Sequence, residues 1–216
     1  MNTKTAGGDS YGSLIVGETG TSTDIRLWNS TSTLYTTAGT SSIYSQDHNG
    51  ADGDLYIFGE YERSSGTDYW SYATDFDGTA LGGGSRQANV YLSDTATTTI
   101  SGGTLNIVGG AAATTTIQNQ GTGNYGLQIT SGTLNASYYQ IRDANGLGLN
   151  MSGASTVVSS LSNGDFELSV EGGTMFTVAS STIDNNAALA VNNTRFATST
   201  GISSGYNGTV SGTDAG

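Results

Sequence analysis

The sequence predicts an all-β protein, a right-handed parallel β-helix (β-solenoid) with about 20 residues per coil. Within short apolar runs, polar and apolar residues alternate, as in strands with one buried face. Across the second half, these runs form two tracks that advance together in steps of 19 to 24 residues. One track is Leu105, Leu127, Leu149, Leu168 and Leu189, and the other is Ile117, Ile141, Leu161, Ile183 and Ile202. A β-solenoid requires such shared periodicity, because each coil buries its inward side chains on the next.

Turn-forming residues separate the apolar runs, and no helix is expected. Glycine is abundant, with 33 residues, and pairs such as Asn145–Gly146, Asn163–Gly164 and Asn207–Gly208 accept the positive φ of sharp corners. Neighbouring asparagines, such as Asn192 and Asn193, are expected to stack as amide ladders at such corners. The alternative fold is an antiparallel β-sandwich, which would hold if the Asn–Gly pairs were hairpin turns.

The regularity of the pattern divides the chain into three parts. Residues 1–86 predict irregular, aromatic-rich N-terminal coils, residues 87–210 predict regular β-helix coils, and residues 211–216 predict a flexible tail. The step from Leu55 to Val90 is 35 residues, so the stretch 61–84 is interpreted as an excursion from one coil. Long excursions from a rigid scaffold are where binding usually takes place.

Composition excludes several classes of function. The net charge is −12 with a single lysine, so the surface repels nucleic acid and anionic membranes, and no segment is apolar enough to insert into a bilayer. The chain lacks cysteine, an N-terminal apolar signal segment and evident end caps. We therefore expect an internal piece of a longer exported chain, at the cell surface or outside the cell.

One loop carries the oxygen ligands that calcium prefers. Asp47, Asn49, Asp52 and Asp54 lie within eight residues, with glycines between them. The spacing departs from the EF-hand pattern, because Ala51 stands where a third ligand belongs. The loop therefore predicts either a calcium site, the one cofactor that the sequence suggests, or an Asx-rich hairpin turn with exposed carboxylates.

An aromatic cluster lies in the expected excursion. Tyr69, Trp70 and Tyr72 are candidates for binding a glycan or a partner protein, because aromatic faces stack on sugar rings and form interface hot spots. The alternative is that these rings fold back and cover the solenoid core.

No catalytic residues are predicted. His48 is the only histidine, so a Ser–His–Asp arrangement has one candidate base, in a glycine-rich loop. The five arginines are scattered, whereas a polysaccharide lyase would need them near paired acids. The chain is therefore expected not to be an enzyme, with polysaccharide cleavage as the alternative.

The chain resembles the right-handed parallel β-helix repeats of large bacterial surface proteins, including adhesin-like passengers. The Gly-Gly-Thr corners, the turn at residues 181–186 and the strand at residues 193–196 carry the resemblance, which covers residues 53–210. It implies export, a multidomain parent and a structural or adhesive role in a surface protein or filament. A carbohydrate-binding or polysaccharide-cleaving module is the alternative. The expected partners are further copies stacked end to end, neighbouring repeats of a longer chain, or glycans.

Overall fold

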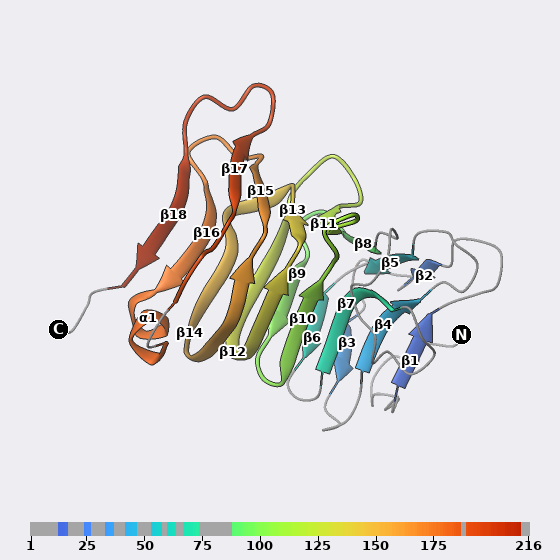
Figure 1. Cartoon of the computed structure of the whole chain (residues 1–216). Helices are drawn as coiled ribbons and strands as arrows, with labels where there is room; N and C mark the ends of the chain where they lie inside the picture. The colour runs from blue at the N-terminus through green and yellow to red at the C-terminus, as the bar shows by residue number, and fades with distance from the viewer. Residues whose placement is uncertain are drawn as a thin grey trace.

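The chain folds as a parallel β-solenoid in which coils recur about every 28 residues. The computed structural model describes residues 13–16, 24–26, 33–36, 42–46, 53–57, 60–63, 67–73, 88–186 and 189–212. The coils follow one another in chain order along one axis, so β1 and β18 lie at opposite ends of the molecule (Figure 1). The predicted fold class is confirmed.

The described strands form three stacks, and successive coils add one strand to each. The first stack contains β1 (Ser13–Val16), β4 (Ser42–Gln46), β7 (Thr67–Ala73), β10 (Thr104–Val108) and the second halves of β12 (Tyr125–Ser137) and β14 (Ala144–Ser162). The second contains β2 (Asp24–Arg26), β5 (Gly53–Ile57), β8 (Ala88–Leu92), β11 (Thr115–Asn119), β13 (Tyr139–Ile141), β15 (Asp165–Leu168) and β17 (Arg195–Thr198). The third contains β3 (Thr33–Thr36), β6 (Glu60–Arg63), β9 (Thr97–Ile100), the first halves of β12 and β14, β16 (Thr174–Ala179) and β18 (Tyr206–Ser211).

All pairings between these strands are parallel, and the single antiparallel bridge in the described residues joins Gly110 to Ala113 inside one loop. Parallel strands cannot be joined by a two-residue hairpin, because the chain must first cross back to the starting edge. The alternative of an antiparallel β-sandwich is therefore wrong.

The predicted period of about 20 residues is also wrong, although part of the predicted register is right. Leu127 pairs with Leu149, as expected, but Leu105 pairs with Leu134 rather than with Leu127. Coils differ in length because the connections between their strands differ in length. A fixed step therefore matched residues from different stacks, and the true spacing is about 28 residues.

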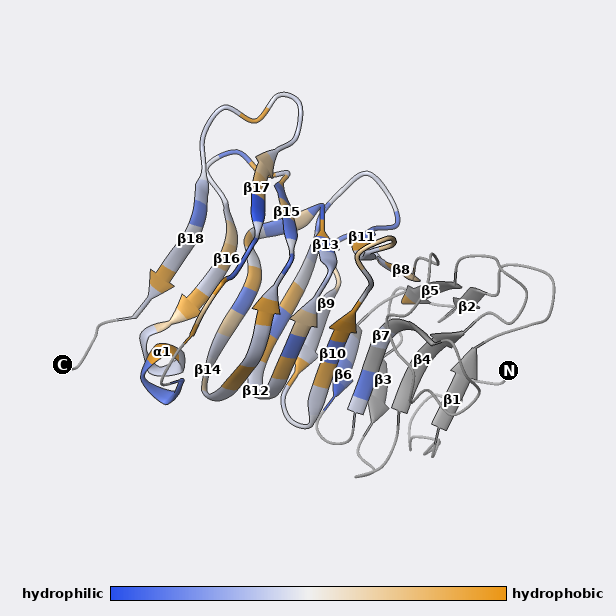
Figure 2. Cartoon of the chain, viewed as in Figure 1, coloured by the Kyte–Doolittle hydropathy of each residue, from blue (hydrophilic) through white to orange (hydrophobic). Residues whose placement is uncertain are grey.

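The core lies inside the coils, where side chains from all three stacks meet. In the second stack the backbone register aligns a column of apolar residues that changes from aliphatic to aromatic toward the C-terminus: Ile25, Leu55, Val90, Ile117, Ile141, Phe166 and Phe196. Of these, Val90, Ile117, Ile141 and Phe166 are buried. Figure 2 shows hydrophobic and hydrophilic residues alternating along β12 and β14. Leu147 and Val157, by contrast, are exposed.

One corner shows why glycine is needed between the third and first stacks. Gly103 and Gly132 both have positive φ, 73° and 86°, and Thr133 donates its backbone N–H to the Gly103 carbonyl at 2.8 Å. A Cβ on Gly132 would lie 2.5 Å from that carbonyl oxygen. The Gly-Thr sequence of this corner thus permits both the left-handed turn and the close approach of successive coils.

The C-terminal coils contain one short helix, α1 (Ser180–Asn185), where only a turn was expected. Its buried Thr182 hydroxyl donates to the carbonyls of Met151 and Gly153. Just after the helix, the Asn186 side chain accepts from the backbone N–H of Val158 at 2.8 Å and donates to the Thr156 carbonyl at 2.8 Å. The amide of Asn186 therefore takes the place of a neighbouring strand beside this part of β14.

Two buried tyrosines make the fold sensitive to alkaline pH. Burial raises the pKa of Tyr125 and of Tyr139 above the ordinary value of 10.0. Above pH 10 the unfolded chain loses both phenolic protons while the folded chain keeps them, so stability falls as pH rises. The expected loss between pH 10 and 11 is about 2 kcal/mol, because each unfolded tyrosine is only half ionised at pH 10. Urea unfolding of wild type and of Tyr125→Phe/Tyr139→Phe checks this, because the double variant lacks that part of the slope.

Candidate functional site

The predicted calcium loop lies mostly outside the described residues. Asp47, Asn49 and Asp52 are not among them, and of Asp54 only the backbone is described, on β5 between Asp24 and Asn89. Calcium binding by these residues therefore stays a prediction.

The predicted excursion at residues 61–84 is partly wrong. Residues 60–63 and 67–73 form β6 and β7, which pair with strands of the coils on both sides. Trp70 is 1% exposed and aligns with Ile107, so its ring belongs to the core and is not offered to a ligand. Tyr69 and Tyr72 lie on β7, and their side chains are outside the described set. For Trp70, the interpretation that the rings cover the core is the one that fits.

A buried polar cluster crosses the corner between β6 and β7. The Tyr61 hydroxyl and the Arg63 guanidinium both donate to the carboxylate of Asp68, and all three side chains are buried. Asp68 aligns with Ile43 and Leu105, which means that the carboxylate occupies an inward position of the first stack. Desolvation raises the pKa of Asp68, and the hydrogen bonds from Arg63 and Tyr61 oppose that shift.

The chemistry of this cluster suits a structural role, not a catalytic one. Arg63 comes from the third stack and Asp68 from the first, so their ion pair fixes one strand against the next around the corner. A buried carboxylate held by two donors inside the core cannot reach a substrate in solution.

A polar column runs across the outer side of the second stack, over four successive coils. The Thr116 hydroxyl donates to Gln140 at 3.4 Å, Gln140 donates to Asp165 at 2.9 Å, and Arg195 donates to the same Asp165 carboxylate oxygen. The backbone register places these four residues directly side by side. The column therefore links neighbouring coils by hydrogen bonds outside the core. It ends at Arg195, whose side chain is 64% exposed.

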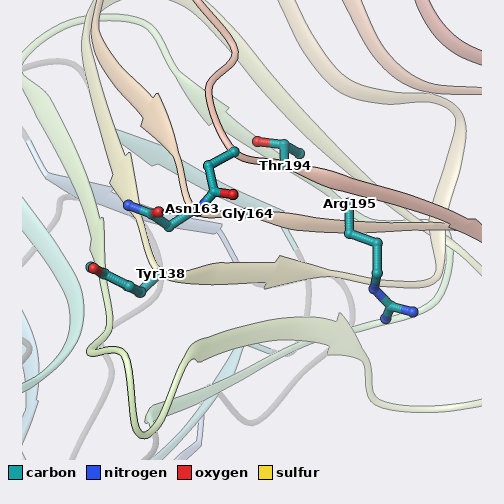
Figure 3. Close-up of a pocket in the computed structure, with 6 residues that line it drawn as sticks. Tyr138, Asn163, Gly164, Thr194 and Arg195 are labelled. Atoms are coloured by element: carbon teal, nitrogen blue, oxygen red, sulfur yellow. Dashed lines mark hydrogen bonds between the residues drawn. The ribbon is translucent and has the colours of Figure 1, made fainter.

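A shallow groove of about 450 Å³ lies at the corner between the first and second stacks. It is lined by Tyr138, Asn163, Gly164, Asn193, Thr194 and Arg195, which come from three successive coils (Figure 3). Three of these residues, Tyr138, Asn163 and Asn193, have positive φ, and Asn193 donates to the Asn163 side chain at 2.6 Å. The expected amide ladder at Asn193 is therefore present.

The floor of the groove depends on Gly164. Tyr139, which is buried, packs its ring beneath this glycine, and a Cβ at position 164 would lie 2.2 Å from its Cζ and 2.4 Å from its Oη. The groove is thus lined by one tyrosine and two asparagines on an open surface, while the guanidinium of Arg195 is bound to Asp165. Such a surface can hydrogen-bond and stack on a polar, ring-shaped ligand.

Sequence reasoning missed both the cluster and the groove. The alternation of β7 places Asp68 on the same side as Trp70, a signal that an acid points inward. For the groove, the Asn163–Gly164 corner was recognised, but nothing in the sequence brings Tyr138 and Arg195 to it. They meet there because successive coils are 25 to 30 residues long at this point.

Two features are absent from the residues that the structure describes. Within those ranges, no three or more His, Cys, Asp or Glu side chains gather in a way that could hold a metal ion. No helix of the described chain has the length and apolar character needed to cross a membrane.

Comparisons with protein-family models, with curated proteins and with solved structures gave no match to the chain.

Proposed function

We propose that the chain is a non-catalytic structural or adhesive β-solenoid module of an extracellular surface protein or filament. The observation that carries the proposal is the continuous parallel stack, in which each interior coil pairs its backbone with the coils on both sides. Such a stack grows along one axis by adding coils, so it suits a rigid spacer or stalk whose reach depends on coil number.

The surface of the stack supports the same role. Side-chain hydrogen bonds join neighbouring coils outside the core, as from Asn135 to Asn106 at 3.0 Å and from Gln140 to Asp165 at 2.9 Å. These contacts stabilise the spacing of coils from the outside while the apolar columns do so from the inside. The net charge of −12 keeps such a surface soluble and opposes nonspecific association.

Antibody labelling of the source cells tests the proposal. An antibody raised against the purified chain is applied to intact and to lysed cells, and the same antibody is used on an immunoblot. We expect labelling of intact cells and a band heavier than the 22.0 kDa of this chain. Labelling that requires lysis, together with a band at 22.0 kDa, would show that the chain is not part of a surface protein.

The groove supports a second candidate function, binding of a neutral glycan. Its tyrosine ring and amides suit a sugar, and the overall negative charge disfavours an anionic one. A glycan array with wild type, Tyr138→Ala and the matched control Tyr206→Ala tests this. Tyr206 is exposed on β18 and does not line the groove. We expect Tyr138→Ala alone to lose binding, and absence of binding by wild type removes this candidate.

A further inference from the structure

The C-terminal end of the solenoid presents two open edges. Among the described residues, β17 pairs with β15 alone and β18 pairs with β16 alone. On β18, Tyr206 is 65% exposed and Val210 is 57% exposed. An exposed strand with unpaired backbone groups and apolar side chains is a template for pairing with another strand.

The register relates this end to the N-terminal end of the same chain. At that end, the described strands β2 and β3 begin the same two stacks, each with a pairing on one side, to β5 and β6. In the second stack, the column that begins at Asp24 continues through Asp54, Asn89, Thr116, Gln140 and Asp165 and ends at Arg195. The neighbouring column begins at Ile25 and ends at Phe196.

In the second stack, the two ends are therefore complementary in charge and in hydrophobicity. One end of the polar column carries an acid, and the other carries a base that is largely exposed. The adjacent column ends in an apolar residue on both sides. In the third stack, Leu34 starts the column that ends at Gly208, and Thr36 starts the column that ends at Val210.

We propose that a second copy of this chain docks its β2 and β3 edge onto β17 and β18, in continuation of the register. Asp24 of the second copy then lies opposite Arg195, Ile25 opposite Phe196, and Thr36 opposite Val210. This contact is heterologous, because different surfaces meet, so repetition gives an open filament rather than a closed dimer. The inference rests on the proposed structural function and specifies the partner and the contact.

Net charge works against this contact and sets the conditions for observing it. Two copies of charge −12 repel each other at long range, but the Debye length is about 8 Å at 0.15 M salt. Paired strands lie closer than that, at roughly 4.7–4.9 Å. Assembly is therefore expected at physiological ionic strength and is weakened at very low salt.

A charge-swap experiment tests the register. Arg195→Asp places acid against acid across the contact, and Asp24→Arg places base against base, so each variant alone is expected to need at least about tenfold higher concentration to assemble. In a mixture of the two, each interface again joins an acid to a base, and assembly should return. Sedimentation velocity and negative-stain electron microscopy report assembly, after circular dichroism has shown that each variant is folded.

Two matched controls keep the result interpretable. Arg142→Asp makes the same charge change within the solenoid, where Arg142 pairs with Glu167 at 3.4 Å, and should assemble like wild type. Val210→Lys should block the contact on β18, whereas Val157→Lys, on the exposed side of β14, should not. If Arg195→Asp fails to fold, the comparison of Val210→Lys with Val157→Lys tests the contact instead.

The outcomes separate this inference from the proposed function. Restored assembly in the mixture supports the register. A wild-type chain that stays monomeric at high concentration, or single variants that assemble as wild type does, would overturn it. Either negative result leaves the surface labelling of source cells to decide the structural function by itself.

Discussion

Replacing Asp68 with alanine is expected to lower the free energy of unfolding by roughly 3–5 kcal/mol. The carboxylate accepts from Arg63 and Tyr61 in a region where all three side chains are buried. Its removal takes the Asp68 carboxylate away from a buried guanidinium, and breaking a buried ion pair by removing one partner costs far more than a lost surface contact. Urea unfolding followed by far-ultraviolet circular dichroism measures the change.

Two further variants show whether the loss of stability comes from the broken ion pair or from general disruption of the fold. Replacing both partners with apolar residues, as in Arg63→Met/Asp68→Leu, should recover most of the lost stability, because no charge is then left in the core. Arg142→Met removes a half-exposed cation that pairs with Glu167, and should change stability by less than about 1 kcal/mol. If Asp68→Ala cost no more than Arg142→Met, the cluster would not be buried as described.

Replacing Phe166 with alanine is expected to cost about 3–5 kcal/mol. The ring is 1% exposed and lies among three others: its centroid is 5.5 Å from that of Tyr139, 5.8 Å from Phe196 and 6.0 Å from Phe176. Removing it leaves a cavity between successive coils that backbone pairing prevents from collapsing. The midpoint of thermal or urea unfolding reports the loss.

Phe196→Ala is the matched control for this prediction. The same side chain is removed from the same column, but Phe196 lies on β17, at the end of the stack, and is only partly buried. We expect less than half of the Phe166 effect. Equal losses at both positions would mean that the column does not end at β17.

The sequence allowed prediction of the fold class because alternation and glycine corners are local signals. The pairing of Leu127 with Leu149 and of Ile117 with Ile141 followed from the same pattern. The coil length could not be predicted from that pattern. The number of residues in each connection depends on how the chain returns to the stack, and the spacing of apolar residues does not show which stack a residue joins. Leu105 was for this reason assigned a neighbour from another stack.

The candidate groove and the buried cluster were harder to predict for a related reason. Tyr138, Asn163 and Arg195 belong to three different coils, so their proximity can be predicted only from the coil register. Trp70 was a candidate for binding because of its aromatic neighbours, with a place in the core as the alternative. It lies in the core because β7 is a strand of the solenoid and not part of an excursion. Helix α1 was missed because six residues are too short for a helical periodicity to be visible.

Paired cysteines test most directly the register in which coils of about 28 residues stack. The chain has no native cysteine, so an introduced pair is unambiguous. Asn106 and Asn135 are aligned on neighbouring strands, so the Asn106→Cys/Asn135→Cys variant should form a disulfide on mild oxidation, visible as a mass loss of two hydrogens. Asn106→Cys/Gln128→Cys should not, because Gln128 aligns with Thr99 and Asn150 in another stack. Efficient bridging of the second pair and not the first would contradict the account.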